Sequence, residues 1–421
     1  MNEQGISPMT QPVDKRAAAG VAVAATVGNM VGITPAISAT FGVFLVPISV
    51  EFGWSRATVS GVFGLIAVVS AIMYPVIGRL MDRYGSRWIL IGGNILFAFS
   101  IALLSLATAS VSRFYLIFGL IGIAGSIPST PMLCKVVSNW FDEKRGLMLG
   151  VTAGIGNGVG STFMPIIAGI LLGAVGWRGS FVAIAAVVLL LGFPFLFLLL
   201  RDAPVSPGVT EAPLEGMNVS EAAQTWPFWV MLTAVAVGAG GMTAVFTHVV
   251  PMLTDHGVGV GEATLVVAIF ALVAASWQIV TGTMLDRFRS PRVVVPMFAS
   301  AIVGLMLLQF GHGTPTLILA GVLLGIGLGA EYGALPYFIS RYFGLRYYGS
   351  ITGVLYGVVI LVQGATPALM DLGFSATGNY DAATIVIMAA LAIGLVLLAL
   401  LPPLHLLPTP AKSRLRERRT I

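Results

Sequence analysis

The sequence contains few charged residues, a single cysteine and no cluster of metal-binding side chains. Lys, Arg, Asp and Glu make up 9% of the 421 residues, whereas hydrophobic residues make up 57%. A soluble protein of this length could not cover its surface with so few charges, so the composition places the chain in a membrane. The lone Cys134 excludes an internal disulfide. The histidines and acids are scattered along the chain, so we expect no enzyme, no metal site and no cofactor.

Most of the sequence consists of long runs of apolar residues. A helix needs about 20 apolar residues to cross ~30 Å of hydrocarbon. Such runs predict twelve spans, at residues 18–48, 56–77, 88–108, 114–137, 147–172, 180–200, 227–252, 262–284, 293–310, 315–338, 349–371 and 382–403. The first run is too long for the core of a signal peptide and has no convincing cleavage site, so we expect it to be a span. The sequence therefore predicts an all-α membrane protein.

The predicted spans form two groups of six. Between them, residues 201–226 hold three prolines, several acids and little apolar content, which is typical of a flexible connection. The predicted domains are an N-terminal tail (1–16), a first six-helix bundle (17–200), the linker (201–226), a second six-helix bundle (227–404) and a basic tail (405–421).

The basic residues predict the orientation. With the N-terminus in the cytoplasm, 19 of the 22 Lys and Arg residues lie in cytoplasmic segments, and only Arg56, Arg113 and Arg178 lie outside. We therefore expect both termini to be cytoplasmic. The basic tail is interpreted as a topology determinant, and no nucleic-acid partner is expected.

Two loops in corresponding places repeat a pattern. "GRLMDRYGSR" follows the second span and "GTMLDRFRSPR" follows the eighth, at an offset of 204 residues. The copies align Gly78 with Gly282, Asp82 with Asp286, and Arg83 with Arg287. Glycine allows a close helix approach, aspartate can accept hydrogen bonds at a helix N-terminus, and arginine can pair with acids of the inner face. A loop that only carries stop-transfer charge explains one copy but poorly explains two, so we interpret both as gating loops.

These loops resemble the signature loop of the major facilitator superfamily, and the resemblance covers essentially the whole chain. The segments 41–61, 139–160, 247–263 and 329–353 resemble the monocarboxylate transporter branch and its bacterial relatives. The resemblance implies two pseudo-symmetric six-helix bundles that alternate access to a site between them. It also implies a small-molecule substrate, a location in a bacterial inner membrane, and function as a monomer in the bilayer.

One departure from that branch bears on the substrate. The eighth helix of the branch commonly carries an aspartate and, four residues later, an arginine that engages the substrate carboxylate; here these positions are Ala274 and Gln278. The spans 262–284 and 349–371 contain no Lys or Arg, so we do not expect a doubly charged substrate. A monoanion held by helix N-termini and by amide or hydroxyl donors, or a neutral solute, both fit.

Polar residues near the middle of the spans are the candidates for substrate binding. Alone, each is more often a packing residue than a ligand, but together they could line a cavity between the halves. They are Asn29, Thr34, Ser38, Asn157, Gln278, Tyr356 and Gln363. Lys135, near the inner end of the fourth span, is expected to extend to the lipid headgroups.

Glu331 is the one acidic residue near the centre of a predicted span. It precedes Arg341 by ten residues, or ~15 Å along a helix. A carboxyl at this depth should face the interior, where it has a partner or is protonated. Two interpretations stay open: a proton-coupling or substrate-contacting residue, and a structural acid satisfied by neighbouring donors.

The sequence therefore predicts a secondary transporter that takes up a small organic monocarboxylate or similar apolar acid together with protons. The first alternative is an exporter, an antiporter of a neutral or amphiphilic metabolite or drug. The second is a membrane sensor that transports nothing. The repeated loops favour transport over the sensor.

Overall fold

The computed structural model describes residues 14–203 and 216–404, and these residues are almost entirely helical. An all-α fold is thus confirmed. The predicted basic tail, most of the N-terminal tail and residues 204–215 of the linker lie outside the described residues. Helices are expected in hydrocarbon because they satisfy every backbone N–H and C=O within one segment. Large apolar side chains such as Ile72, Ile170 and Leu190 point outward, as they would toward lipid.

The first six spans are built from short and long helical pieces. The first and second spans are α1 (Lys15–Met30), η1 (Thr34–Ser38) and α2 (Phe41–Phe52), then α3 (Arg56–Ser60) and α4 (Val62–Tyr84). The third and fourth are α5 (Arg87–Ala102) and η2 (Leu103–Leu106), then α6 (Val111–Gly125) and α7 (Thr130–Trp140). The fifth and sixth are α8 (Arg145–Gly150), η3 (Val151–Ile155), α9 (Gly156–Val187), η4 (Val188–Gly192) and α10 (Phe193–Leu199).

The fifth and sixth spans form one helical stretch, Arg145–Leu199, of 55 residues. The backbone of Gly176 inside it has φ 69° and ψ 174°, which is not helical, so the stretch consists of two helices. In all, eleven helical stretches in the described residues are long and apolar enough to cross a membrane, and this one accounts for two spans. Twelve spans result, as the apolar runs predict.

The second half follows a short linker helix, α11 (Val219–Ala223). Its spans are α12 (Trp226–Asp255), α13 (Val260–Phe288), η5 (Pro291–Val294) with α14 (Val295–Phe310), α15 (Thr314–Tyr342), α16 (Tyr348–Thr377) and α17 (Asp381–Leu400). Proline lies in the first turn of α12, α14 and α15, where its missing N–H leaves no helical hydrogen bond unmade.

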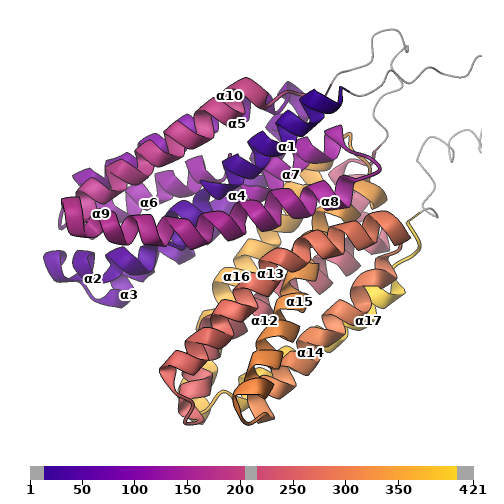
Figure 1. Ribbon diagram of the computed structural model, residues 1–421. Coiled ribbons are helices and arrows are strands. Elements are labelled where there is room, and N and C mark those ends of the chain that lie inside the picture. Colours follow the sequence, from indigo (N-terminus) through magenta and orange to yellow (C-terminus); the bar gives the residue numbers. More distant parts are fainter. Residues whose placement is uncertain (1–13, 204–215, 405–421) are drawn as a thin grey trace, which may run out of the picture.

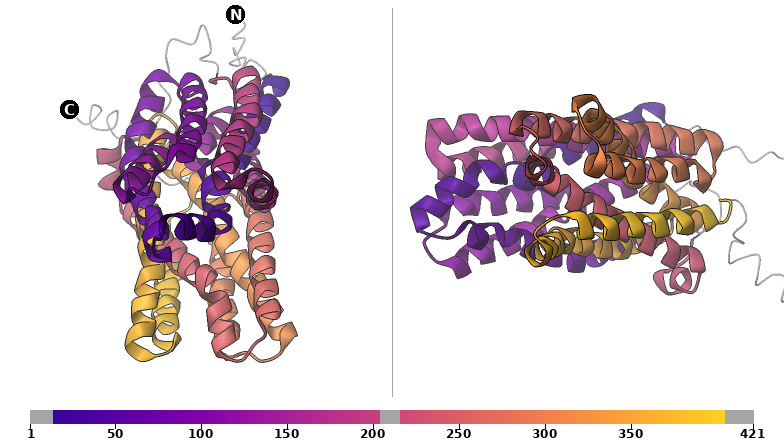
Figure 2. Two further views of the ribbon diagram at one scale, coloured as in Figure 1. Left: turned by 90° about the vertical axis from the view of Figure 1, so that its left-hand side faces the viewer. Right: turned by 90° about the horizontal axis from the view of Figure 1, so that it is seen from below.

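The two halves meet at one end and separate toward the other. In Figure 1 the first half, indigo to magenta, and the second half, orange to yellow, converge on the side that holds the start of α1 and the end of α17, and they diverge away from it. In the right-hand view of Figure 2, the end of α17, in yellow, lies on the side where the halves converge.

Three apolar cores match this shape. One core contains residues of both halves, for example Leu133 and Leu335, together with the beginning of α1 and the end of α17. The second core holds first-half residues such as Phe114, and the third holds second-half residues such as Phe270. We call the end with the shared core the closed end and the opposite end the open end.

Candidate functional site

Glycine pairs bring the two halves into backbone contact at the closed end. A Cβ atom on Gly78 of α4 would overlap with the carbonyl oxygen of Gly349 in α16. In the other half the relation repeats, because a Cβ atom on Gly282 of α13 would overlap with the carbonyl oxygen of Gly146 in α8. Two helix pairs, each with one member from either half, therefore touch without intervening side chains.

Asp82 binds the start of α16. Its carboxylate accepts hydrogen bonds from the backbone N–H of Gly349 (3.0 Å), from the N–H of Ser350 (2.7 Å) and from the hydroxyl of Ser350 (2.6 Å). A carboxylate at a helix N-terminus satisfies free N–H groups and is favoured by the helix dipole. Asp82 of the first repeated loop therefore connects the first half to α16 of the second half.

Lys135 pairs with the same carboxylate. Its ammonium lies 3.1 Å from Asp82, and the two side chains are only 5% and 6% exposed. The expectation that Lys135 extends to the lipid headgroups is therefore wrong. Asp82 is buried between the halves and gives the Lys135 ammonium a carboxylate partner. Lys135 lies in α7 and Asp82 in α4, and the sequence alone does not show that these two helices bring the side chains together.

Asp286 makes the corresponding contact with α8. Its carboxylate accepts hydrogen bonds from the backbone N–H of Gly146 (2.9 Å) and of Leu147 (2.8 Å). Asp82 of the first half thus binds the start of a helix in the second half, and Asp286 of the second half binds the start of a helix in the first half.

The arginines of the repeated loops lie elsewhere. The guanidinium groups of Arg83 and Arg287 lie over the rings of Tyr84 and Phe288 that follow them. Neither is in an ion pair with a described residue, so the expected pairing with acids of the inner face is not found there.

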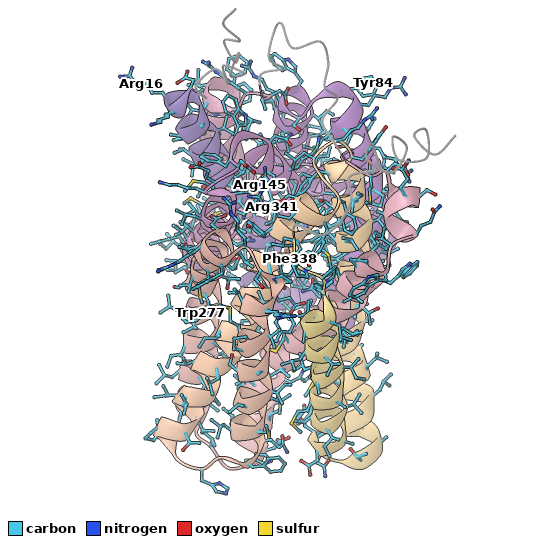
Figure 3. The ribbon with its side chains drawn as sticks, turned by 90° about the vertical axis from the view of Figure 1, so that its right-hand side faces the viewer. Arg16, Tyr84, Arg145, Trp277, Phe338 and Arg341 are labelled. Carbon is cyan, nitrogen blue, oxygen red and sulfur yellow. The ribbon has the colours of Figure 1, made fainter. Side chains whose placement is uncertain are left out.

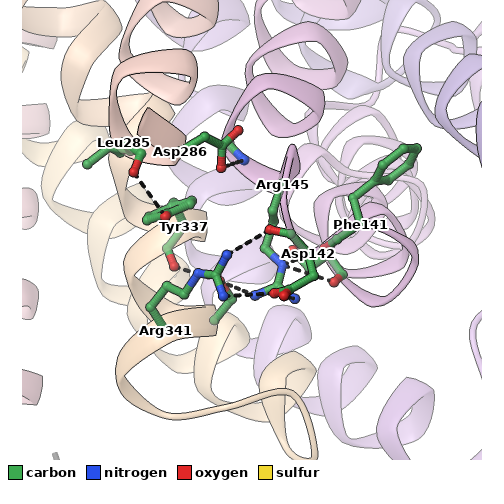
Figure 4. Close-up of polar contacts among 10 residues, drawn as sticks. Phe141, Asp142, Arg145, Leu285, Asp286, Tyr337 and Arg341 are labelled. Carbon is green, nitrogen blue, oxygen red and sulfur yellow. Dashed lines mark hydrogen bonds and ion pairs between the residues drawn. The ribbon is translucent and has the colours of Figure 1, made fainter. Parts of the chain in front are cut away.

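A different pair of arginines bridges the halves. Arg341 of α15 donates to the carboxylate of Asp142 (2.8 Å) and to its backbone carbonyl (2.7 Å). Arg145 lies 3.2 Å from the same carboxylate and also donates to the hydroxyl of Ser340. Figures 3 and 4 show Arg145 and Arg341 close together where the halves meet. Sequence reasoning missed this cluster, although its charged residues lie in the corresponding loops 139–150 and 341–353.

All hydrogen bonds and ion pairs between the halves in the described residues lie at the closed end. They involve the Asp82, Asp286 and Asp142 clusters. At the open end, the pairs Glu51–Arg178 and His248–Asp371 each lie within one half. Opening the closed end would break these bonds, whereas movement at the open end breaks none of them.

Two of the first-half candidates belong to one hydrogen-bonded group. The side-chain amide of Asn29 donates to the carbonyl of Thr152 (2.9 Å), and its oxygen accepts from the hydroxyl of Thr130 (2.7 Å). Asn157 donates to the same hydroxyl oxygen (3.1 Å). The carbonyl oxygen of Asn157 is buried without a hydrogen-bond partner in the described residues, which leaves one acceptor for a ligand.

Thr34 and Ser38 lie at the two ends of η1, a π-helical turn within the first span. Both are exposed. A π-helical turn disturbs the regular hydrogen-bond ladder and is frequent at functional sites.

The second-half candidates are divided. Gln363 of α16 donates to the hydroxyls of Tyr332 in α15 and Thr243 in α12, so three helices meet there. Tyr356, on the same helix, is half-buried. Gln278 is 7% exposed and packs against Gly154 of the opposing half, so it lies at the interface between the halves.

Glu331 is enclosed within the second half. It is 1% exposed, and its carboxylate lies so near Gly238 of α12 that a Cβ atom there would be 3.1 Å from Oε2. Oε1 has no hydrogen-bond partner and no cation pairs with the carboxyl in the part of the chain that the structure describes. Its sequence neighbour Tyr332 belongs to the Gln363 group.

Comparisons with known proteins agree with this architecture. The family model described as Major Facilitator Superfamily matches residues 27–367 and 244–420. The chain is 27% identical to an MFS-type transporter of Gibberella moniliformis, over 77% of this chain and 78% of that one. It is 26% identical to human monocarboxylate transporter 11, over 84% of this chain and 74% of that one. The crystal structure of the transporter FucP in the outward conformation is similar, with a TM-score of 0.68 at 14% identity, covering 91% of this chain and 99% of that one.

Proposed function

The chain belongs to the major facilitator superfamily and is a multi-pass membrane transporter of the secondary kind, and we propose that it takes up a small organic monocarboxylate together with protons. The proposal places it in a bacterial inner membrane with both termini in the cytoplasm. The closed end is then the cytoplasmic end, and the structure faces outward.

Alternating access is supported by the distribution of bonds and cores. Each half has its own apolar core toward the open end, so it can move as a unit. Opening the other end would separate the shared apolar core and break the polar contacts around Asp82, Asp286 and Asp142. Contacts gathered at one end, with separate cores toward the other, suit a rocking motion between two states.

A monoanionic substrate is supported by neutral hydrogen-bond donors. Gln363 uses its amide to donate to both hydroxyl oxygens of its group, and Tyr332 and Thr243 also hydrogen-bond each other, which leaves one hydroxyl hydrogen for another acceptor. Asn157 offers an unpaired carbonyl oxygen from the first half. In a substrate with a carboxylate and a nearby hydroxyl, the carboxylate could accept from the Gln363 group and the hydroxyl could donate to Asn157. Such binding requires no buried cation. Relatives called monocarboxylate transporters favour the same class.

Proton coupling is supported by Glu331, and this observation carries the proposal. A carboxyl that is 1% exposed and has no cation partner among the described residues is best accommodated in its neutral form. The carboxyl faces Gly238 of α12, and its sequence neighbour Tyr332 joins Thr243 of that same helix in the Gln363 group. A change in water access during transport would let it release and regain a proton.

The test uses Glu331→Gln in proteoliposomes with an imposed pH gradient. We expect the variant to lose proton-driven accumulation of a monocarboxylate while it keeps exchange of substrate between equilibrated compartments. Glu262→Gln, in the first turn of α13, is the matched control and should keep both activities. Accumulation by Glu331→Gln at the wild-type level would rule out the coupling role and leave Glu331 as a structural acid.

An exporter is the second candidate, and the uncharged Gln278 favours it because a neutral solute needs no cation. The direction of the gradient separates the two. A symporter accumulates substrate in vesicles when the outside is acidic, whereas an antiporter expels it. A panel of aliphatic and aromatic monocarboxylates with neutral vitamins tests the substrate class. If no carboxylate binds or competes, the monocarboxylate proposal is wrong.

A further inference from the structure

A cavity lined mainly by residues with polar side chains lies at the closed end, apart from the proposed substrate site. Its volume is about 520 Å³, and its lining includes Arg79, Arg83, Ser220, Tyr347 and Ser350. It is also lined by Asp82, Asn218 and Val219. The walls come from three elements: α4 of the first half, the linker helix α11, and the start of α16 in the second half.

The charge balance of the cavity is positive. Arg79 and Arg83 contribute two guanidinium groups, and Asp82 is the one carboxylate among the described residues that line it. That carboxylate is already neutralised by Lys135 at 3.1 Å and accepts three hydrogen bonds from α16. The two arginines therefore determine the field inside the cavity, and the hydroxyls of Ser220 and Tyr347 add neutral donors.

We propose that this cavity binds a phosphate-bearing anion, and that the anion stabilises the closed end. Arginine donates paired N–H bonds that match phosphate oxygens, and two such groups with hydroxyl donors form a typical phosphate-binding set. The cavity is large enough for a phosphate with attached substituents. A lipid headgroup and a free phosphate compound share this chemistry.

The location links binding to conformation. The linker segment before α11 is attached to the second half, because Met217 donates to the carbonyl of Phe343 (2.9 Å) and Gly216 pairs with Gly344. The cavity thus has one wall on the first half and two on the second. When the closed end opens, Arg79 and Arg83 move away from Tyr347 and the site is lost.

A ligand that binds one of two states shifts their equilibrium by a factor of one plus its concentration divided by Kd. At a hundredfold excess over Kd, the anion would favour the closed end about 100-fold. Phosphate-bearing molecules on this side would then regulate how readily the transporter releases its substrate there. This regulation is independent of which solute is transported.

The test measures the closed end directly. Spin labels on Glu143→Cys of the first half and Phe288→Cys of the second report its width, and the buried Cys134 adds little background. Inorganic phosphate is titrated onto the purified full-length chain in detergent. In a second arm, phosphatidylcholine nanodiscs with and without phosphatidylglycerol are compared. A shift toward short distances with phosphate indicates a soluble ligand, and a shift with phosphatidylglycerol alone indicates a lipid headgroup.

Two variants and a control define the site. Arg79→Gln/Arg83→Gln should weaken the response at least tenfold, and so should Ser220→Glu, which adds a charge at an exposed position. Arg292→Gln removes an exposed charge at the same end outside the cavity and should respond as wild type. A response that both site variants keep, or that Arg292→Gln loses equally, would overturn the proposal. The absence of any response in both arms would overturn it as well.

Discussion

Asp82 concentrates several interactions in one side chain. It binds two backbone N–H groups and a hydroxyl of α16, and it pairs with Lys135 of α7. Asp286 binds two backbone N–H groups of α8, but no buried lysine or arginine forms an ion pair with it in the described residues. We therefore expect the two repeated aspartates to contribute unequally to the stability of the closed end. Removal of one partner of a buried pair leaves the other charge uncompensated, which typically costs about 3–5 kcal/mol.

We expect Asp82→Asn to destabilise the closed end more than Asp286→Asn does. Asparagine keeps one acceptor but leaves the Lys135 ammonium buried without its partner. The Asp82→Asn/Lys135→Met double variant should recover part of the loss, because methionine needs no counter-charge. Thermal unfolding of the purified protein, followed for the single variants and the double variant, measures this coupling. Equal effects of the two aspartate variants, with no recovery in the double variant, would contradict it.

At the scale of helices, close approach depends on glycine. The contact of α4 with α16 places Gly78 against a backbone carbonyl, and α8 meets α13 in the same way. Any side chain at such a position must push two helices apart, since backbone atoms cannot rotate away. The repeated glycines therefore determine how tightly the halves can close.

Gly78→Ala should shift the transporter away from the closed-end state. Overpacking of this kind costs about 1–3 kcal/mol, or roughly a 5- to 150-fold change in the equilibrium. A Cβ atom added to Gly64 of the same helix would meet no atom within 4 Å, so Gly64→Ala is the matched control. Accessibility of cysteines placed at the closed end measures the shift. If both variants behave alike, close approach at Gly78 is not limiting.

Gly176 determines where the fifth and sixth spans separate. Its φ of 69° lies in the region that side chains disfavour, and a Cβ atom there meets nothing within 4 Å. Gly176→Ala should therefore lower stability by about 1–3 kcal/mol through backbone strain alone, because φ 69° with ψ 174° is a conformation that essentially only glycine adopts. Gly173→Ala, three residues earlier in helical conformation and equally open, should be neutral or stabilising. Chemical denaturation of both variants measures the difference, and equal stabilities would show that the kink is not strained.

The whole molecule combines two units that share contacts at one end. The halves have separate cores toward the open end and a common core at the closed end. Movement as two rigid units predicts that links within a half are tolerated and links between halves are not.

A cross-link between Asp142→Cys and Arg341→Cys should therefore abolish transport while substrate still binds from the open end. These side chains are in contact across the halves, with 2.8 Å between their polar atoms. Glu51→Cys/Arg178→Cys joins two residues of the first half and is the control. Uptake and equilibrium binding are measured before and after reduction of the link. If uptake continues while the two halves are cross-linked, the rocking motion is excluded.

The extent of each span was predictable because transfer into hydrocarbon acts on contiguous segments. Apolar run length gave twelve spans, including the separation of 147–172 from 180–200 that the structure places at Gly176. The repeated glycine–aspartate loops could be recognised because duplication preserves a fixed offset. These properties are local or repetitive, and they indicate a membrane-embedded transporter architecture.

The partners of the polar side chains were decided only by the tertiary structure. Asp82 binds Ser350, 268 residues away, and Arg341 binds Asp142, 199 residues away. Lys135 was expected at the headgroups but lies in an ion pair, and Gln278 lies in the interface between the halves. Hydrophobicity determines that a segment enters the membrane, but the rotation and depth of each helix depend on its neighbours. The packing of the helices in the tertiary structure therefore determines which charged side chains form ion pairs.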